Sequence, residues 1–279
     1  MTIRSFRQFK ALTRSYPSSS FEETEGTVWI QCQAHRHFNM LETFGRHRGL
    51  LGGGPISVVD LGAFPGTLLK CLRLYCREEG RLVGIGLEGP EAFVEHLEAF
   101  RIEFLRANLD PIVRTADPLV EALPRRMPLD DGAFDAAFCT EALEHMLDPM
   151  YALREIHRVL RPGGLFLTTT PNLARLANRI KLALFGHSIN YPLRDSVPYG
   201  LTNWRPHMRE YTMSEFTTLV AEAGFEILEQ KYVDVNEDDD RLFRNSSTLR
   251  LRLMKKALKV LTLRPSFRHI LMLMLRKPA

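Results

Sequence analysis

The sequence predicts an α/β fold with an open sheet and helices on both of its faces. Short apolar runs alternate along the chain with segments whose apolar residues recur at helical spacing, the order expected when strands and helices follow one another. The first run, at residues 56–61, is bounded by glycine and proline, which fits a strand that is covered on both faces. With 279 residues and 45% hydrophobic content, the chain can bury one large core.

The first predicted strand ends in an acid and a turn that contains glycine. The apolar run at residues 56–61 includes Asp60 near its end, and Gly62 and Gly66 follow it. Residues 67–79 then place leucines at helical spacing, so the segment predicts a strand, a turn and a helix. In open α/β sheets ligands bind beyond the carboxyl ends of the strands, so we expect the functional site to begin at this turn.

Four more apolar runs predict further strands, and two of them end in polar side chains. The first of these ends in Glu88, which lies 22 residues beyond Gly66. An acid at that offset can accept hydrogen bonds from both hydroxyls of a ribose. The second ends beside Asn108 and Asp110. The four runs are residues 81–88, 102–109, 134–140 and 165–170.

The turn after the first strand resembles the first motif of class I S-adenosylmethionine-dependent methyltransferases. In that family an acid is followed by a turn with three alternating glycines, and residues 60–66 keep the acid and two of the glycines. Phe64 stands where the family usually has its middle glycine. Later segments resemble the same family in the same order, so the resemblance covers residues 56–235. These segments are residues 141–145, 148–149, 161–164, 169–172, 207–212 and 223–225.

This resemblance implies a Rossmann-like doubly wound sheet of about seven strands and S-adenosylmethionine as the cofactor. The sixth strand is expected at residues 225–233, and the apolar run at 270–275 is expected to be a last strand that pairs antiparallel beside it. Glu88 is expected at the ribose, and Asn108 or Asp110 near the adenine. The residues expected at the cofactor are Asp60, Gly62, Ala63, Gly66, Glu88, Asn108, Asp110 and Thr140.

The resemblance also implies methyl transfer, with an oxygen of a small-molecule, sugar or lipid-like compound as the expected acceptor. The sulfonium of the cofactor is already activated, so the protein mainly has to align the acceptor. An oxygen acceptor can need a base. His145 is the candidate, because it follows the fourth predicted strand and an imidazole titrates near neutrality. The alternative role for His145 is structural, with its side chain bonded to the local backbone.

A divalent metal remains an open alternative at the same place. Glu141, Glu144 and His145 are spaced so that they share one face if they lie on a helical turn, and His207 could add a ligand. The set resembles one that some methyltransferases, including quinone-type and small-RNA 3′-end enzymes, use to hold a metal that binds the acceptor hydroxyls. Two carboxylates with histidines suit Mg²⁺, Mn²⁺ or Zn²⁺. Glutamate and histidine before Asp-Pro are also common in methyltransferases without a metal.

Two other functions remain as alternatives. Residues 84–89 match the glycine pattern of dinucleotide-binding enzymes, with Asp110 about 20 residues further on, which would indicate an NAD-dependent dehydrogenase. However, these glycines lie inside the apolar run, so we expect Gly84 and Gly86 to allow close packing against the strand instead. The other alternative is a methyltransferase-like binding module without turnover, because Phe64 departs from the family motif.

The chain is expected to divide into an N-terminal helical cap at residues 1–50 and a methyltransferase domain at residues 51–279. A glycine-rich break at 52–55 separates them, and apolar residues before it predict a helix that covers the cofactor or the substrate entrance. Residues 173–212 are irregular and are expected to form a substrate lid. The helix residues are Phe38, Met40, Leu41 and Phe44, and the lid aromatics are Tyr191, Tyr199 and Trp204.

Basic residues concentrate near the end of the chain. Residues 241–279 contain 11 basic residues and no acids, and the rest carries 26 basic against 33 acidic residues. Residues 241–265 are predicted to be a basic amphipathic connection that either packs on the sheet or makes peripheral contact with an anionic membrane. Nucleic-acid binding is not expected, because the remainder is acidic. No secretory signal or spanning segment is recognised and the four cysteines show no metal-type pairing, so a cytoplasmic location is expected.

Overall fold

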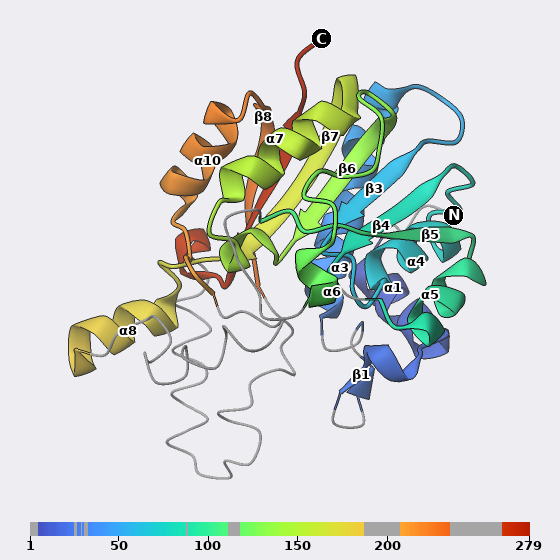
Figure 1. Ribbon diagram of the computed structural model, residues 1–279. Helices are drawn as coiled ribbons and strands as arrows, with labels where there is room; N and C mark the ends of the chain where they lie inside the picture. Colours follow the sequence, from blue (N-terminus) through green and yellow to red (C-terminus); the bar gives the residue numbers. More distant parts are fainter. Residues whose placement is uncertain are drawn as a thin grey trace.

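The computed structural model describes residues 5–24, 27–28, 30, 33–87, 89–110, 118–186, 207–234 and 264–279. At its centre is a seven-stranded sheet with the strand order β5-β4-β3-β6-β7-β9-β8 (Figure 1). The number of strands agrees with the prediction. The strands are β3 (Val58–Leu61), β4 (Leu82–Gly86), β5 (Ile102–Arg106), β6 (Phe134–Thr140), β7 (Leu160–Pro171), β8 (Glu226–Val233) and β9 (Ile270–Arg276).

β3 is an interior strand of the sheet, and the strands that follow it in sequence lie on both sides of it. β4 and β5 follow on one side of β3, whereas β6 and β7 follow on the other side, and all five strands are parallel. β9 pairs antiparallel with both β7 and β8, so the predicted antiparallel last strand is confirmed. Successive strands are thus added first on one side of β3 and then on the other, which makes the boundary between β3 and β6 a topological switch point. Open α/β sheets bind ligands at such a point, at the carboxyl ends of the strands.

Successive residues of each strand point to opposite faces of the sheet, and helices cover both faces. One face carries Val58 and Met272 in an apolar cluster with side chains of α3 (Ala34–His47), α4 (Thr67–Leu74) and α5 (Glu91–Glu98). In Figure 1 these three helices lie together beside β3, β4 and β5.

The other face carries Val59 and Leu273 in a second apolar cluster. Its helical side chains come from α7 (Pro149–Val159) and α10 (Met213–Glu222), which lie in front of the sheet in Figure 1. Neighbouring residues such as Val58 and Val59 thus belong to different clusters, and the predicted doubly wound arrangement is confirmed.

The described residues before α3 pass through short elements and pack on the sheet. Phe9 and Ile30 are buried in the same cluster as Met40 and Phe44 of α3. The predicted helix across residues 38–44 is thus confirmed, while the division of the chain at residue 50 stays a prediction. The short elements are α1 (Phe6–Leu12), the 3₁₀ turns η1 (Thr13–Ser15) and η2 (Ser20–Glu22), and the strands β1 (Glu23–Thr24) and β2 (Thr27–Val28).

α4 ends earlier than predicted, at Leu74 instead of residue 79. The N–H of Cys76 donates to the carbonyl of Cys71 at 3.3 Å, and the chain then leaves the helix. This bend allows the carboxylate of Glu78 to accept the N–H of Ile56 at 2.9 Å. The early end of the helix therefore accompanies a contact between Ile56 and Glu78, which are 22 residues apart. The local spacing of apolar residues cannot predict such a contact.

Part of the predicted lid and most of the basic connection lie outside the described residues. These parts are residues 187–206, which include the three lid aromatics, and residues 235–263. The described start of the lid contains α8 (Leu176–Phe185), which projects from the body of the molecule in Figure 1. No helix in the described part of the chain has the length and apolar character that a bilayer crossing requires. The remaining short elements are η3 (Arg48–Leu51), α6 (Pro118–Glu121), η4 (Leu143–His145) and η7 (Pro265–Phe267).

Candidate functional site

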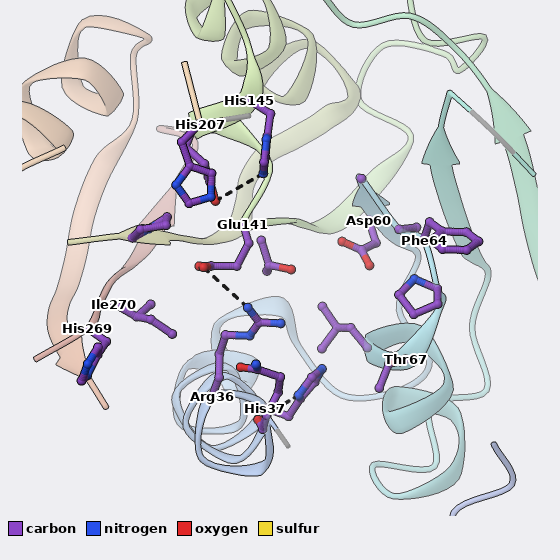
Figure 2. Close-up of a pocket in the computed structure, with 18 of the residues that line it drawn as sticks. Arg36, His37, Asp60, Phe64, Thr67, Glu141, His145, His207, His269 and Ile270 are labelled. Atoms are coloured by element: carbon purple, nitrogen blue, oxygen red, sulfur yellow. Dashed lines mark hydrogen bonds and ion pairs between the residues drawn. The ribbon is translucent and has the colours of Figure 1, made fainter. Parts of the chain in front are cut away.

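A cavity of about 550 Å³ lies at the carboxyl ends of the central strands (Figure 2). Its border includes Asp60 in β3, Thr140 at the end of β6 and Pro171 at the end of β7. Residues of α3 and the first residue of β9, Ile270, contribute to its wall. The cavity therefore lies at the topological switch point between β3 and β6, where open α/β sheets bind ligands.

Asp60 is buried beside this cavity. Its side chain borders the space, and no described residue forms a hydrogen bond with its Oδ1 atom. Burial raises the pKa of this carboxyl to about 8, because the charged form loses hydration. A buried oxygen in this state is suited to a ligand that brings its own hydrogen-bond donors.

Gly62 and Gly66 have left-handed backbone conformations, which glycine adopts without strain. At Gly62, which borders the cavity, a Cβ atom would lie 3.0 Å from the Cβ of Ala142. At Gly66 a Cβ atom would lie 2.5 Å from a methyl carbon of Leu97 on α5. Gly62 thus lets the turn pass close to Ala142 at the border of the cavity, whereas Gly66 does not border the cavity and allows the start of α4 to pack on α5.

Phe64 turns its ring away from Asp60. The residue is 49% exposed, and its ring centroid lies 5.0 Å from that of Phe93 and 6.2 Å from that of Phe21. In Figure 2, Asp60 lies between the ring of Phe64 and the side chain of Glu141. The residue that departs from the glycine pattern therefore does not fill the space between Asp60 and the opposite wall.

Asn108 and Asp110 lie beyond β5 and do not border the cavity. Both carboxyl oxygens of Asp110 accept backbone N–H groups, one from Leu147 at 2.9 Å and one from Asp148 at 3.1 Å. Asn108 accepts the N–H of Asp110 at 3.1 Å. These bonds hold the segment after β5 against the segment that leads into α7.

The other residues expected at the cofactor fall into two groups. Ala63 and Thr140 border the cavity, as expected of residues near a cofactor. Glu88 lies outside the described residues, as does the segment 111–117 that follows Asp110. The expected contacts to the ribose and the adenine therefore stay predictions.

Glu141 has a left-handed backbone with φ of 53° and directs its carboxylate towards Arg36 (Figure 2). The Arg36 guanidinium lies 3.6 Å from Glu141 Oε2. Thr169 forms two hydrogen bonds with Glu141. Its carbonyl accepts the Glu141 N–H at 3.0 Å, and its hydroxyl donates to Glu141 Oε1 at 2.8 Å. The 3₁₀ turn that contains Glu144 and His145 begins after Glu141, so the three residues do not lie on one helical turn.

Glu144, His145 and His207 come together at one side of the cavity. Each offers one ligand atom, and these atoms lie within 4.8 Å of one another. The two imidazole centroids are 4.9 Å apart, and His145 Nε2 lies 3.9 Å from Glu144 Oε1. Burial, and then the charge of Glu141, raise the pKa of Glu144. One carboxylate and two imidazoles suit a divalent ion such as Zn²⁺ or Mn²⁺.

His145 presents an accessible imidazole to the cavity. Its side chain is 31% exposed and borders the cavity, while its backbone N–H donates to the carbonyl of Ala142 at 3.1 Å. The backbone bond belongs to η4, so the side chain is not needed to close this turn. The position suits a base, and that role stays a prediction.

Several cavity residues do not follow from the motifs, above all Arg36 and His37 on α3. They lie one helical turn before Met40 and Leu41, on the face predicted to be apolar, and this spacing is the signal that could have found them. Burial, followed by the charge of Arg36, lowers the pKa of His37 to about 3, so this imidazole is neutral at pH 7. The other residues in this group are Gln33, Arg175 and His269.

Comparison with known protein families identifies the central part of the chain. Two families match it, one at residues 59–168 and one at residues 120–224, and each is described as a methyltransferase domain. The matched residues include Asp60, Gly62 and His145, and they end before β8.

Curated relatives match a similar region. A protein of Mycolicibacterium smegmatis, named as a probable S-adenosylmethionine-dependent methyltransferase, is 32% identical over 145 residues, which are 51% of this chain and 43% of that protein. A ubiquinone biosynthesis O-methyltransferase of Pseudomonas aeruginosa is 32% identical over 173 residues, which are 61% of this chain and 64% of that protein. The chain thus spans less than two thirds of the length of either relative.

Solved structures share the fold. A proposed sarcosine dimethylglycine methyltransferase from Galdieria sulphuraria has a TM-score of 0.52 at 15% identity, covering 88% of this chain and 86% of that one. The cyclase SpnF has a TM-score of 0.51 at 20% identity, covering 98% and 94%. These likenesses concern the fold alone, since one fold can host different reactions.

Proposed function

Because the chain belongs to the class I S-adenosylmethionine-dependent methyltransferases, we propose that it transfers the methyl group of S-adenosylmethionine to an oxygen atom of a small-molecule acceptor. The observation that carries this proposal is the cavity after β3, with the buried oxygen of Asp60 and the left-handed turn at Gly62 on its border. Both residues lie inside the part of the chain that matches methyltransferase domains.

The turn after β3 has features that suit a large polar cofactor. The Asp60 carboxyl can accept hydrogen bonds from amino or hydroxyl groups, and Gly62 borders the same cavity without a side chain. The hydroxyl of Thr140 can donate or accept on the same border. S-adenosylmethionine supplies a methyl group that is already activated, so the residues of this chain have to align the acceptor and exclude water.

The acceptor is proposed to bind at the side of the cavity that carries the histidines. His145 and His207 both border this side, and His145 is accessible enough to take a proton from an acceptor hydroxyl. An imidazole is suited to this step at neutral pH. The relative from Pseudomonas aeruginosa is named as an O-methyltransferase, which supports an oxygen acceptor.

A divalent ion held by Glu144, His145 and His207 is a second proposal for the same side. The close grouping of their ligand atoms favours it. An ion at this place would bind the acceptor oxygen and favour its deprotonated form, so a free imidazole base would not be needed. The two proposals differ in their requirement for metal, and chelation therefore separates them.

Calorimetric titration with S-adenosylhomocysteine tests the cofactor site, with NADH as the parallel control. We expect micromolar binding of S-adenosylhomocysteine that Asp60→Ala weakens, and no heat of binding with NADH. Absence of S-adenosylhomocysteine binding would overturn the proposal, and binding of NADH alone would support the dehydrogenase. Methyl transfer to a panel of hydroxylated small molecules then separates an enzyme from a binding module without turnover.

A further inference from the structure

The N-terminal segment meets α4 at a buried carboxylate, that of Glu22. Its Oε1 atom accepts the hydroxyl of Thr67 at 2.8 Å and also the hydroxyl of Tyr16. Its Oε2 atom accepts the ammonium of Lys70 at 2.7 Å, and the N–H and hydroxyl of Ser19 at 3.3 Å. The side chains of Glu22 and Lys70 are both fully buried. These bonds join η2 to the first turn of α4, directly after the glycine-bearing turn.

The ammonium of Lys70 is surrounded by polar and aromatic groups. Besides Glu22, it contacts the carbonyl of Pro17 at 2.6 Å and Nε2 of His96 at 2.8 Å. It also lies 4.5 Å from the centre of the Tyr16 ring. Burial lowers the pKa of Lys70, and Glu22 opposes this shift. A buried ion pair is strongly destabilised when one partner is removed, because the other charge then stays buried without compensation.

Glu22 contacts the turn at residues 64–67 through Thr67, and Phe21, the residue before Glu22, contacts the same turn through Phe64. Its ring centroid lies 6.2 Å from that of Phe64 and 5.8 Å from that of Phe93 on α5, both with edge-on geometry. Phe64 and Thr67 both border the cavity, and Figure 2 shows them on the same side of it. Two adjacent residues of the N-terminal segment therefore contact both ends of the turn.

We propose that Phe21 and Glu22 are positioning residues that hold the turn at residues 64–67 in its cofactor-binding conformation. The inference rests on the proposed function, because it takes this turn as the cofactor site. Both residues lie before residue 59, where the match with methyltransferase domains begins. Within the matched region the ring of Phe64 contacts that of Phe93. Phe21 adds the second partner from outside that region.

A turn that is already held in place binds its ligand more tightly, because less conformational freedom is lost on binding. Phe21 and Glu22 would not contact the reacting atoms. Loosening the turn is therefore expected to raise the Kd and the KM for the cofactor, while kcat at saturating cofactor changes little.

The test compares Phe21→Ala and Glu22→Gln with a control variant, Glu155→Gln, each in the full chain. Glu155 is also a buried carboxylate in an ion pair, accepting Arg158 at 2.8 Å and the N–H of Met127 at 2.9 Å, and it does not border the cavity. All three changes are expected to lower the melting temperature. Only the first two are expected to weaken S-adenosylhomocysteine binding, by about tenfold, the size of effect that 1.4 kcal/mol produces.

Hydrogen exchange provides a second readout that needs no ligand. Amide hydrogens of residues 62–68 are expected to exchange faster in Phe21→Ala and Glu22→Gln than in Glu155→Gln. If the native protein did not bind S-adenosylhomocysteine, the proposed function would fail, whereas the exchange comparison would still decide whether these residues hold the turn. Exchange and affinity that match those of Glu155→Gln would overturn the inference. If Glu22→Gln does not fold, Glu22→Leu combined with Lys70→Met removes both buried charges and gives the same comparison.

Discussion

Arg36 on α3 and Glu141 after β6 form an ion pair on the border of the cavity, with 3.6 Å between a guanidinium nitrogen and Oε2. Arg36 lies before the region that matches methyltransferase domains, whereas Glu141 lies inside it. The pair therefore connects the N-terminal segment to the end of a central strand at the place where cofactor or acceptor would bind.

Arg36→Met is expected to lower the free energy of unfolding by about 1–3 kcal/mol. The substitution leaves the carboxylate of Glu141, whose side chain is 21% exposed, without this cation. Combining it with Glu141→Gln should cost less than the sum of the two single changes. Urea unfolding of the four proteins measures the coupling, and strictly additive losses would show that the pair contributes nothing.

Asp60 is expected to make the stability of the ligand-free protein fall as pH rises. Its pKa is about 8 in the folded state and 3.8 when unperturbed, so between these values the folded protein keeps a proton that the unfolded chain has lost. The free energy of unfolding then decreases by up to about 1.4 kcal/mol per pH unit from this group, and the decrease stops above the folded pKa. Asp60→Asn should flatten this part of the pH profile in urea unfolding, and an unchanged slope would contradict the assignment.

Binding of S-adenosylhomocysteine near neutral pH is expected to release up to about one proton. Hydrogen-bond donors of the ligand would stabilise the charged form of Asp60, which burial disfavours in the free protein. Calorimetry in two buffers of different ionisation enthalpy measures the number of protons released. Asp60→Asn is the control, because it has no proton to lose. Equal heats in both buffers with the native protein would count against a direct contact between Asp60 and the ligand.

The metal proposal gives a prediction that separates two neighbouring glutamates. His207→Ala should abolish stoichiometric Mn²⁺ or Zn²⁺ binding, because it removes one of the three grouped ligands. Glu141→Gln should leave binding in place, since the Glu141 carboxylate lies against Arg36 and Thr169. Calorimetric titration with the metal salt measures both. If methyl transfer continues in EDTA and His207→Ala binds metal as the native protein does, the metal proposal for Glu144, His145 and His207 would be wrong.

The two glycines of the turn are expected to respond differently to alanine. Gly66→Ala should mainly lower stability, because its Cβ would lie 2.5 Å from Leu97, whereas Gly62→Ala should also weaken cofactor binding, because Gly62 borders the cavity. Gly186→Ala is the matched control, since Gly186 has φ of 60° and no atom within 4 Å of the added carbon. Gly186→Ala should lower the free energy of unfolding only by the strain of a left-handed backbone at alanine, about 1–2 kcal/mol. Thermal unfolding and S-adenosylhomocysteine titration together distinguish the three outcomes.

Most of the sheet was predictable because strands such as β3, β6 and β9 lie in apolar runs that the local sequence identifies. β8 contains Glu229 and Lys231 and was expected from the family resemblance instead. The observed strands begin and end within a few residues of the predicted ones, and Asp60 follows the first run into the cavity as expected. β7 is the main exception, since it begins at Leu160, five residues before the predicted run. Its first residue pairs with Phe134 across an irregular register, so tertiary pairing extends it beyond the apolar segment.

The charged residues of the interior were not predictable from local pattern. Lys70 lies on a helix where lysine normally reaches water, and the partner that allows its burial, Glu22, is 48 residues away in sequence. The left-handed backbone of Glu141 is likewise unexpected for a residue other than glycine, and Thr169 of the next strand supplies the contacts that hold it. These features depend on residues that meet only after the chain has folded.

β9 has a consequence for any shortened form of this protein. The match with methyltransferase domains ends at residue 224, before β8 and β9, yet β9 pairs with β7 along seven consecutive residues from Leu165 to Pro171. A chain cut at that boundary would expose a long row of unpaired backbone N–H and C=O groups on β7, which is an open template for association with other chains. We therefore expect β9 to protect the protein against aggregation, although it contributes to the cavity only through Ile270.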